Sequence, residues 1–317
     1  MVERSDGIII RDNRITYATN GFTDVGYGIL LQQSNDAIIF NNMCERISLA
    51  GIESQYGKNN TFLNNNCSNT FNVGIVLFEE TLSKIINNTC NHNIRGIIIM
   101  DSSITLESNQ MNQNGHLGCI LDKVYDSTIT RNTVNHNGGE GFWTTGLINT
   151  AFTENSVCYN GEQGIWISGS RDSIVTENSV CFNNYIGVQC VGITGFTFAF
   201  NQIENNTYYG LSVAGYSSDN IIHHNRFVWN NLGGTSQAYD IGNNTLWYDV
   251  DTKEGNYWSD HKRGKYKIDG DANSKDPYPL NNDLERADFY YLTFILSFPI
   301  ISIIIFRRRK IKTNRKW

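Results

Sequence analysis

The sequence lacks several patterns that would assign it to a common class. Neither the L-x-x-L-x-L spacing of leucine-rich repeats nor a run of good helix formers is present. No CxxC or HxxxH pattern occurs, which argues against a zinc site. Basic residues are scarce before the C-terminus: seven of the 25 Lys and Arg residues follow residue 306, which leaves 18 against all 31 acidic residues. An acidic body argues against nucleic acid as a partner, because nucleic-acid binding needs a basic surface.

What the sequence does contain is a repeat with a period of 21 to 23 residues. Two asparagine series keep this period, one from Asn42 to Asn225 and the other from Asn93 to Asn230. Glycine followed by apolar residues recurs with the same period at Gly7, Gly28, Gly51, Gly74, Gly96, Gly118, Gly141, Gly164, Gly187 and Gly210. A repeat of this length indicates a solenoid.

Apolar residues alternate within each repeat unit. In GIWI, Ile165 and Ile167 are expected to face the core and Trp166 the outside, because strand side chains alternate with a period of two. Asn- and Gly-rich turns separate such short strands. We therefore predict an all-β fold, a parallel β-helix of nine to ten coils of about 23 residues over residues 1–235. The asparagines are expected at coil corners, where they adopt the left-handed conformation and bond along the stack.

The cysteines divide into two groups. Cys44, Cys67 and Cys90 fall in one inward column and are expected to be buried, free thiols. Cys158 and Cys181 share the next register on adjacent coils, about 4.8 Å apart, within the range of a disulfide. A disulfide and two free thiols are both compatible with this spacing.

The C-terminal part reads differently from the coils. Residues 236–285 form a closing segment rich in Asp and aromatic residues, and residues 286–306 are predicted to be a transmembrane helix, since 289–306 contain no charge. The basic tail 307–317 is expected in the cytoplasm. A final buried strand or capping helix is the alternative.

The first ten residues lack the apolar core of a signal peptide, yet the predicted anchor places the coils at the cell surface.

Oxygen donors cluster in the closing segment, where DGDANSKD supplies Asp269, Asp271, Asn273 and Asp276. Alternating Asp and Asn in a loop is typical of calcium sites. The loop lacks an EF-hand's Gly at its sixth position and Glu at its last. An Asx-rich turn without metal is the alternative, and no other cofactor is expected.

The 23-residue coils followed by GNYWSD, DGDAN and DPYP resemble right-handed parallel β-helix proteins of the NosD-like group, which carry PbH1 repeats and are common on archaeal surfaces. The resemblance covers about residues 7–235 for the coils and 245–280 for the closing motif. It implies a right-handed β-helix of a type associated with carbohydrate binding, sugar hydrolysis or periplasmic copper binding. His261 and ANSKD depart from the group's usual pattern, which puts a metal role for this loop in doubt.

Residues of the coils suggest two further hypotheses, an enzyme that acts on polysaccharides and a copper-related accessory protein. Glu154 and Glu177 are expected about 5 Å apart with Arg131 in the same outward row, a separation that suits a polysaccharide lyase or glycoside hydrolase. Stacked glutamates on a solvated face are the alternative. A copper-related accessory function would need clustered ligands, whereas His223 and His224 are expected to point to opposite faces of a strand.

The remaining hypothesis is a non-catalytic binding protein. Trp143 and Trp166 are expected side by side on the outer face of consecutive coils, with Tyr159, Glu140 and Glu162 as a polar rim. A neighbouring loop or a second subunit covering this pair is the alternative. We therefore predict a membrane-anchored, extracellular β-helix that binds a surface polysaccharide, a glycoprotein or a partner protein.

Overall fold

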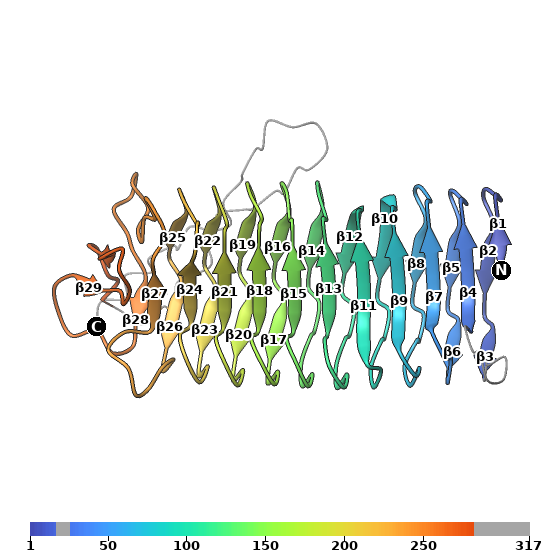
Figure 1. Cartoon of the computed structure of the whole chain (residues 1–317), viewed down its shortest axis with the longest axis horizontal. Coiled ribbons are helices and arrows are strands. Elements are labelled where there is room, and N and C mark those ends of the chain that lie inside the picture. Colours follow the sequence, from blue (N-terminus) through green and yellow to red (C-terminus); the bar gives the residue numbers. More distant parts are fainter. Residues whose placement is uncertain (17–25, 282–317) are drawn as a thin grey trace, which may run out of the picture. The chain divides into compact units, whose positions relative to one another are not determined.

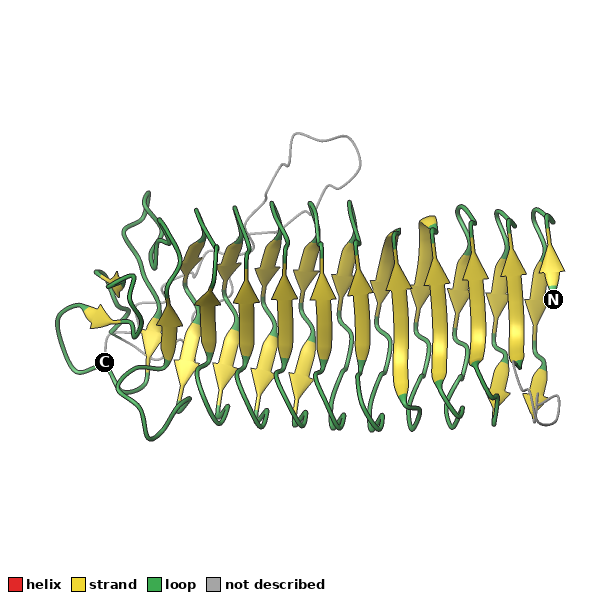
Figure 2. Cartoon of the chain, in the orientation of Figure 1, coloured by secondary structure: helices red, strands yellow, loops and turns green. Residues whose placement is uncertain are grey.

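The structure is a computed structural model that describes residues 1–16 and 26–281. Residues 1–280 form one compact unit built from strands and turns (Figure 2). None of the residues described belongs to a helix long and apolar enough to cross a membrane. The predicted transmembrane helix 286–306 and the basic tail 307–317 lie outside the described residues.

Parallel sheets run along the stacked coils (Figure 1). The first sheet, sheet A, contains β1 (Val2–Glu3), β4 (Tyr27–Gln32), β7 (Ala50–Gln55), β9 (Val73–Phe78), β11 (Arg95–Met100), β13 (Cys119–Asp122), β15 (Phe142–Thr145), β18 (Ile165–Ser168), β21 (Val188–Val191), β24 (Leu211–Ala214) and β27 (Ala238–Asp240). Sheet B contains β2 (Ile9–Arg11), β5 (Ile38–Phe40), β8 (Thr61–Leu63), β10 (Thr81–Ile86), β12 (Ser103–Glu107), β14 (Thr128–Thr130), β16 (Ala151–Thr153), β19 (Ile174–Thr176), β22 (Thr197–Ala199) and β25 (Ile221–His223).

The third side of each coil carries the shortest strands. Sheet C consists of β3 (Arg14–Thr16) with β6 (Met43–Glu45), and of β17 (Ser156–Cys158), β20 (Ser179–Cys181), β23 (Gln202–Glu204), β26 (Arg226–Val228) and β28 (Tyr257–Trp258). Isolated parallel bridges connect these two groups through the intervening coils. A short antiparallel pair, β29 (Tyr266–Lys267) and β30 (Lys275–Asp276), follows the last coil. The prediction of an all-β parallel β-helix is confirmed.

The register between coils follows the repeat through the middle of the chain and departs from it at the start. Val157 lies opposite Val180, as equivalent positions of the repeat should. Gly7, however, donates its N–H to Asn35 O in a turn, and it does not join the column that begins with Gly28. The assignment of Gly7 to the glycine series was wrong, because the alternation of inward side chains sets the register rather than the glycine spacing.

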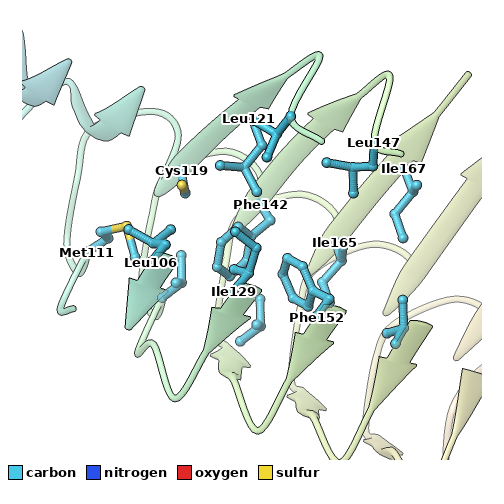
Figure 3. Packing of buried hydrophobic residues seen from close by; sticks show 14 of the residues in the cluster. Leu106, Met111, Cys119, Leu121, Ile129, Phe142, Leu147, Phe152, Ile165 and Ile167 are labelled. Atoms are coloured by element: carbon cyan, nitrogen blue, oxygen red, sulfur yellow. The ribbon is translucent and has the colours of Figure 1, made fainter. Parts of the chain in front are cut away.

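The core is a set of apolar columns that run through the coils. Cys44, Cys67 and Cys90 are fully buried and free, as predicted. Bulky side chains from sheets A and B meet in the middle coils, where the rings of Phe142 and Phe152 pack edge to face with centroids 4.6 Å apart (Figure 3). Each fully buried side chain of this size contributes about 1.5–3 kcal/mol to stability.

Two buried asparagine ladders hold neighbouring coils together. Asn132 Oδ1 accepts from the backbone N–H (2.9 Å) and the Nδ2 (3.0 Å) of Asn109, and its own Nδ2 donates to Leu106 O and to Asn155 Oδ1. The ladder asparagines do not have a positive φ, contrary to our prediction. The residue before each of them does, as at Arg131 and Glu154. The corner is therefore made by that preceding residue, and the asparagine amide can point inward.

The closing segment packs on the last coil and caps the core. Asn256 extends the first ladder, since its Oδ1 accepts from Asn225 N at 3.0 Å. The Trp258 ring stacks between Phe227 (4.3 Å between centroids) and Tyr266 (4.0 Å). Asp276 is buried and accepts from Trp258 Nε1 at 2.9 Å. The motifs GNYWSD and DPYP thus close the open end of the stack, as terminal units of solenoids must.

A buried glutamate in the fourth coil is a polar exception in the interior. Glu80 is fully buried, and its carboxyl group accepts from Ser54 Oγ (2.6 Å), Ser83 Oγ (2.6 Å) and Asn60 Nδ2 (3.0 Å). Burial raises the pKa of Glu80, while these hydrogen bonds lower it. The alternating pattern of the sequence contains no sign of this cluster, because its members come from different repeats.

Replacing Glu80 with alanine should lower the free energy of unfolding by about 2 kcal/mol, because three buried donors lose their acceptor. The matched control is Glu79→Ala at the exposed neighbouring position, which should change stability by less than about 0.5 kcal/mol. Urea unfolding measures both variants. Equal effects of the two substitutions would show that the buried cluster contributes nothing specific.

Candidate functional site

The outer face of sheet A carries a continuous row of apolar side chains. Its members occupy equivalent positions on five consecutive strands and are all partly exposed: Val76, Ile98, Ile120, Trp143 and Trp166. We call this set the apolar row. Trp143 and Trp166 are direct neighbours on β15 and β18, as predicted. Both are half-buried, so each indole presents part of its surface to solvent.

The residues predicted to rim the tryptophan pair occupy separate columns. Glu140 is half-exposed and comes just before β15, while Glu162 is exposed and donates its backbone N–H to Gly139 O. On the far side of the pair, Gln163 Nε2 donates to Gln189 Oε1 at 2.8 Å. Glu140 therefore precedes Trp143 and Glu162 precedes Trp166 in the sequence, while Gln189 lies opposite Trp166 on β21.

Tyr159 belongs to a different feature from the one predicted. Its ring is sandwiched between His136 (4.8 Å between centroids) and Phe182 (4.9 Å), with nearly parallel planes. Tyr159 and Phe182 are half-exposed, at 50% and 42%. Because the rings cover one another's faces, this stack presents mainly ring edges to solvent. It is a less suitable surface for a sugar ring than the apolar row, because sugars pack on the apolar faces of aromatic rings.

A disulfide lies beside this stack. Cys158 and Cys181 are bonded to each other across adjacent coils, with their Cα atoms 4.6 Å apart. The spacing in the sequence left free thiols open as an alternative, and the structure selects the disulfide. Both residues are buried, at 5% and 9% exposure, although their register is not that of the core columns.

The predicted carboxylate pair lies at a corner of the coils. Glu154 and Glu177 have positive φ values and occupy the column that precedes the first asparagine ladder. Burial, and then the charge of Glu154, raise the pKa of Glu177. Arg131 forms its ion pair with Glu107 on the preceding coil, on the side away from the two glutamates. The structure therefore brings the two carboxylates to adjacent coils, while the arginine is engaged elsewhere.

Further along the same column, the histidines depart from the prediction. His223 Nδ1 and His224 Nδ1 lie 2.6 Å apart, although consecutive strand residues should point to opposite faces. The prediction was wrong because His224 has a φ of 55°, which ends the strand alternation after His223. Burial, and then the neighbouring His224, lower the pKa of His223 to about 4, while Asp249 acts in the opposite direction.

The four residues predicted to bind calcium have different environments. Asp276 is buried in the cap, whereas Asp271 and Asn273 are exposed. Asp269 accepts from Thr235 Oγ1 (2.7 Å) and Tyr209 Oη (3.2 Å). The bonds to Asp269 and Asp276 hold the segment on the last coil. Calcium binding by this loop stays a prediction.

The coils, ladders and cap define the class of protein, a parallel β-helix. The sequence profile described as "Right handed beta helix region" matches residues 1–157 and 147–249. The chain therefore belongs to the right-handed β-helix family. Among curated proteins, none matches the sequence significantly.

Solved structures of similar fold include two epimerases and a tailspike protein. The A-module of the Azotobacter vinelandii mannuronan C-5 epimerase AlgE6 is 15% identical with a TM-score of 0.56, over 77% of this chain and 73% of that one. The Dettilon tailspike protein is 15% identical with a TM-score of 0.62, over 76% of this chain but only 54% of the tailspike. The periplasmic alginate epimerase AlgG, in a double-mutant form, is 15% identical with a TM-score of 0.52, over 69% and 72%. At these identities the likeness shows the fold alone.

Proposed function

We propose that this protein is a non-catalytic, glycan-binding β-helix of the cell surface, which holds a polysaccharide or a glycoprotein glycan on its apolar row. The observation that carries the proposal is the pairing of the partly exposed Trp143 and Trp166 on neighbouring strands. Indoles offer apolar faces to the C–H faces of sugars and an N–H donor to their hydroxyl groups. The carboxylates of Glu140 and Glu162 and the amide of Gln189 supply hydrogen-bonding groups at the edge.

Two further observations support a long ligand. The apolar row extends over five strands, and at about 4.8 Å per strand it spans roughly 19 Å, more than one sugar unit. Contiguous exposed apolar surface of this kind marks an interaction site. The epimerases of similar fold act on mannuronan and alginate, which are polysaccharides.

The cell-surface part of the proposal rests on the sequence. The uncharged segment 289–306 followed by the basic tail 307–317 is typical of a membrane anchor with a cytoplasmic end. Protease treatment of intact cells should then remove the coils and leave the tail protected. Protection of the coils in intact cells would contradict this arrangement.

Glycan binding is tested with an array that includes mannuronan, alginate and other surface polysaccharides. The double variant Trp143→Ala, Trp166→Ala should bind the recognised glycan at least about tenfold more weakly, because buried aromatic anchors dominate such interfaces. Its melting temperature should stay close to that of the wild type, since both side chains lie on the outer face.

The matched control is Tyr216→Ala, which removes a fully exposed aromatic side chain from another part of the surface. It should leave the array profile unchanged. If the tryptophan variant folds and keeps the wild-type profile, the apolar row is not the glycan site. Sedimentation as a dimer that the tryptophan variant abolishes would instead identify the row as a contact between subunits.

A polysaccharide-active enzyme, either a lyase or a glycoside hydrolase, is the second candidate. The placement of Glu154 and Glu177 on adjacent coils favours it, because glycoside hydrolysis uses a pair of neighbouring carboxyl groups, and burial and the charge of Glu154 raise the pKa of Glu177. Incubation of polysaccharides with the protein, with and without calcium, tests for product release. Products that disappear in Glu177→Gln would establish catalysis in place of simple binding.

A further inference from the structure

We propose that His223, His224 and Asp249 form a binding site for a divalent transition-metal ion of the zinc type. One ligand atom from each residue lies within 4.8 Å of the others. Two imidazole nitrogens and a carboxylate oxygen are the donors that zinc prefers. The sequence contains no zinc pattern, because two of the ligands are adjacent and the third follows 25 residues later in the closing segment.

The backbone brings these groups together in a defined way. His223 ends β25, and the left-handed conformation of His224 turns its ring back toward that of His223. His224 N donates to Gly255 O at 2.7 Å, which fixes the closing segment beside it. Asp249 N donates a hydrogen bond to Glu254 O at 2.9 Å, so both residues lie at the base of one turn.

A second, independent observation is the group that holds the outer nitrogen of His224. His224 Nε2 lies 2.8 Å from Glu254 Oε2. With its proton on Nε2, the ring donates to this carboxylate and directs the lone pair of Nδ1 toward His223. A carboxylate that accepts from the far nitrogen of a ligating histidine is a recurrent feature of metal sites. Asp249 is oriented in turn by Asp251 N, which donates to its Oδ1 at 2.9 Å.

The metal would take the place of the close contact between the two Nδ1 atoms. An ion about 2.0–2.1 Å from each nitrogen in tetrahedral geometry needs the rings to separate by less than about 1 Å. All three ligands are half-buried, so a water molecule or a ligand group can complete the coordination. The ion would connect β25 of the last full coil to the closing segment and so stabilise the cap.

The experiment is zinc binding by the full-length chain in detergent, measured by equilibrium dialysis and by melting temperature. We expect one Zn²⁺ per chain and a higher melting temperature with Zn²⁺ than with EDTA, and no such rise with Mg²⁺. His223→Gln, His224→Gln and Asp249→Asn should each abolish this binding. Glu254→Gln should weaken it by about 10- to 100-fold, because it removes only the carboxylate behind His224.

The matched control is His92→Gln, which removes an exposed histidine that also has a positive φ. It should bind zinc like the wild type. Each variant is first shown to melt like the wild type in EDTA. If a variant is unstable, the visible spectrum of the Co²⁺-loaded wild-type protein tests for nitrogen and oxygen ligands in its place. No bound zinc, or equal binding by a folded His224→Gln protein, would overturn the proposal.

Discussion

Replacing Asn183 with alanine is expected to lower the free energy of unfolding by about 4 kcal/mol, because several buried hydrogen bonds are lost together. Asn183 Oδ1 accepts from Asn160 N and Asn160 Nδ2, both at 3.0 Å. Its Nδ2 donates to Val157 O at 3.0 Å and to Asn206 Oδ1 at 2.9 Å. Alanine leaves the buried Asn160 N–H without this acceptor, while Asn160 Nδ2 keeps its bond to Val134 O and Asn206 Oδ1 keeps its bond from the backbone N–H of residue 183.

The control for this ladder residue is its neighbour. Asn184 is exposed, and its backbone N–H donates to Asn160 O at 3.0 Å, a bond that alanine keeps. Asn184→Ala should therefore change the stability by less than about 0.5 kcal/mol. Chemical denaturation measures the free energy of unfolding of both variants. A cost below about 1 kcal/mol for Asn183→Ala would mean that the ladder is not a main source of cohesion between coils.

Replacing Gly164 with alanine is expected to cost about 3 kcal/mol, because the new methyl group has no space. A Cβ atom at Gly164 would lie 2.7 Å from Gly187 O, from Val180 Cγ1 and from Asn183 Nδ2. The carbonyl group belongs to the next coil and cannot retreat without opening the stack. The asparagine amide cannot move without losing its bond to Val157 O.

Gly233→Ala is the control for this substitution, since a Cβ atom there meets nothing within 4 Å and φ is not positive. Its effect should be neutral or slightly stabilising, because alanine restricts the unfolded chain. Thermal unfolding of the two variants is a sufficient measurement. Similar melting temperatures for Gly164→Ala and Gly233→Ala would refute the close approach between coils.

These two predictions share one cause. The glycines from Gly96 to Gly210 keep the same period as the second asparagine series because each of these glycines leaves space that an asparagine amide occupies. The same pairing recurs at Gly141 with Asn160 and at Gly187 with Asn206. The shared period of the glycine and asparagine series thus indicates that their members are in contact in the folded chain.

The sequence was sufficient for the fold and for the residues that repeat. Alternation within GIWI predicts that Trp166 faces outward, and the period places Trp143 beside it, as the structure has them. The same reasoning brought Cys158 and Cys181 together. It could not choose between a disulfide and free thiols, because spacing fixes proximity but not bonding.

The sequence by itself determined whatever depends on period and alternation: parallel coils, inward columns, asparagine ladders and the tryptophan pair. Tertiary structure alone decided what depends on backbone conformation at single corners and on contacts between the coils and the closing segment. His223 and His224 converge because one residue leaves the strand conformation, and Asp249 reaches them from a segment outside the repeat. Glu80 is buried among donors from its own coil and from the preceding one. A repeat pattern averages over its units, so it cannot report what a single unit does differently.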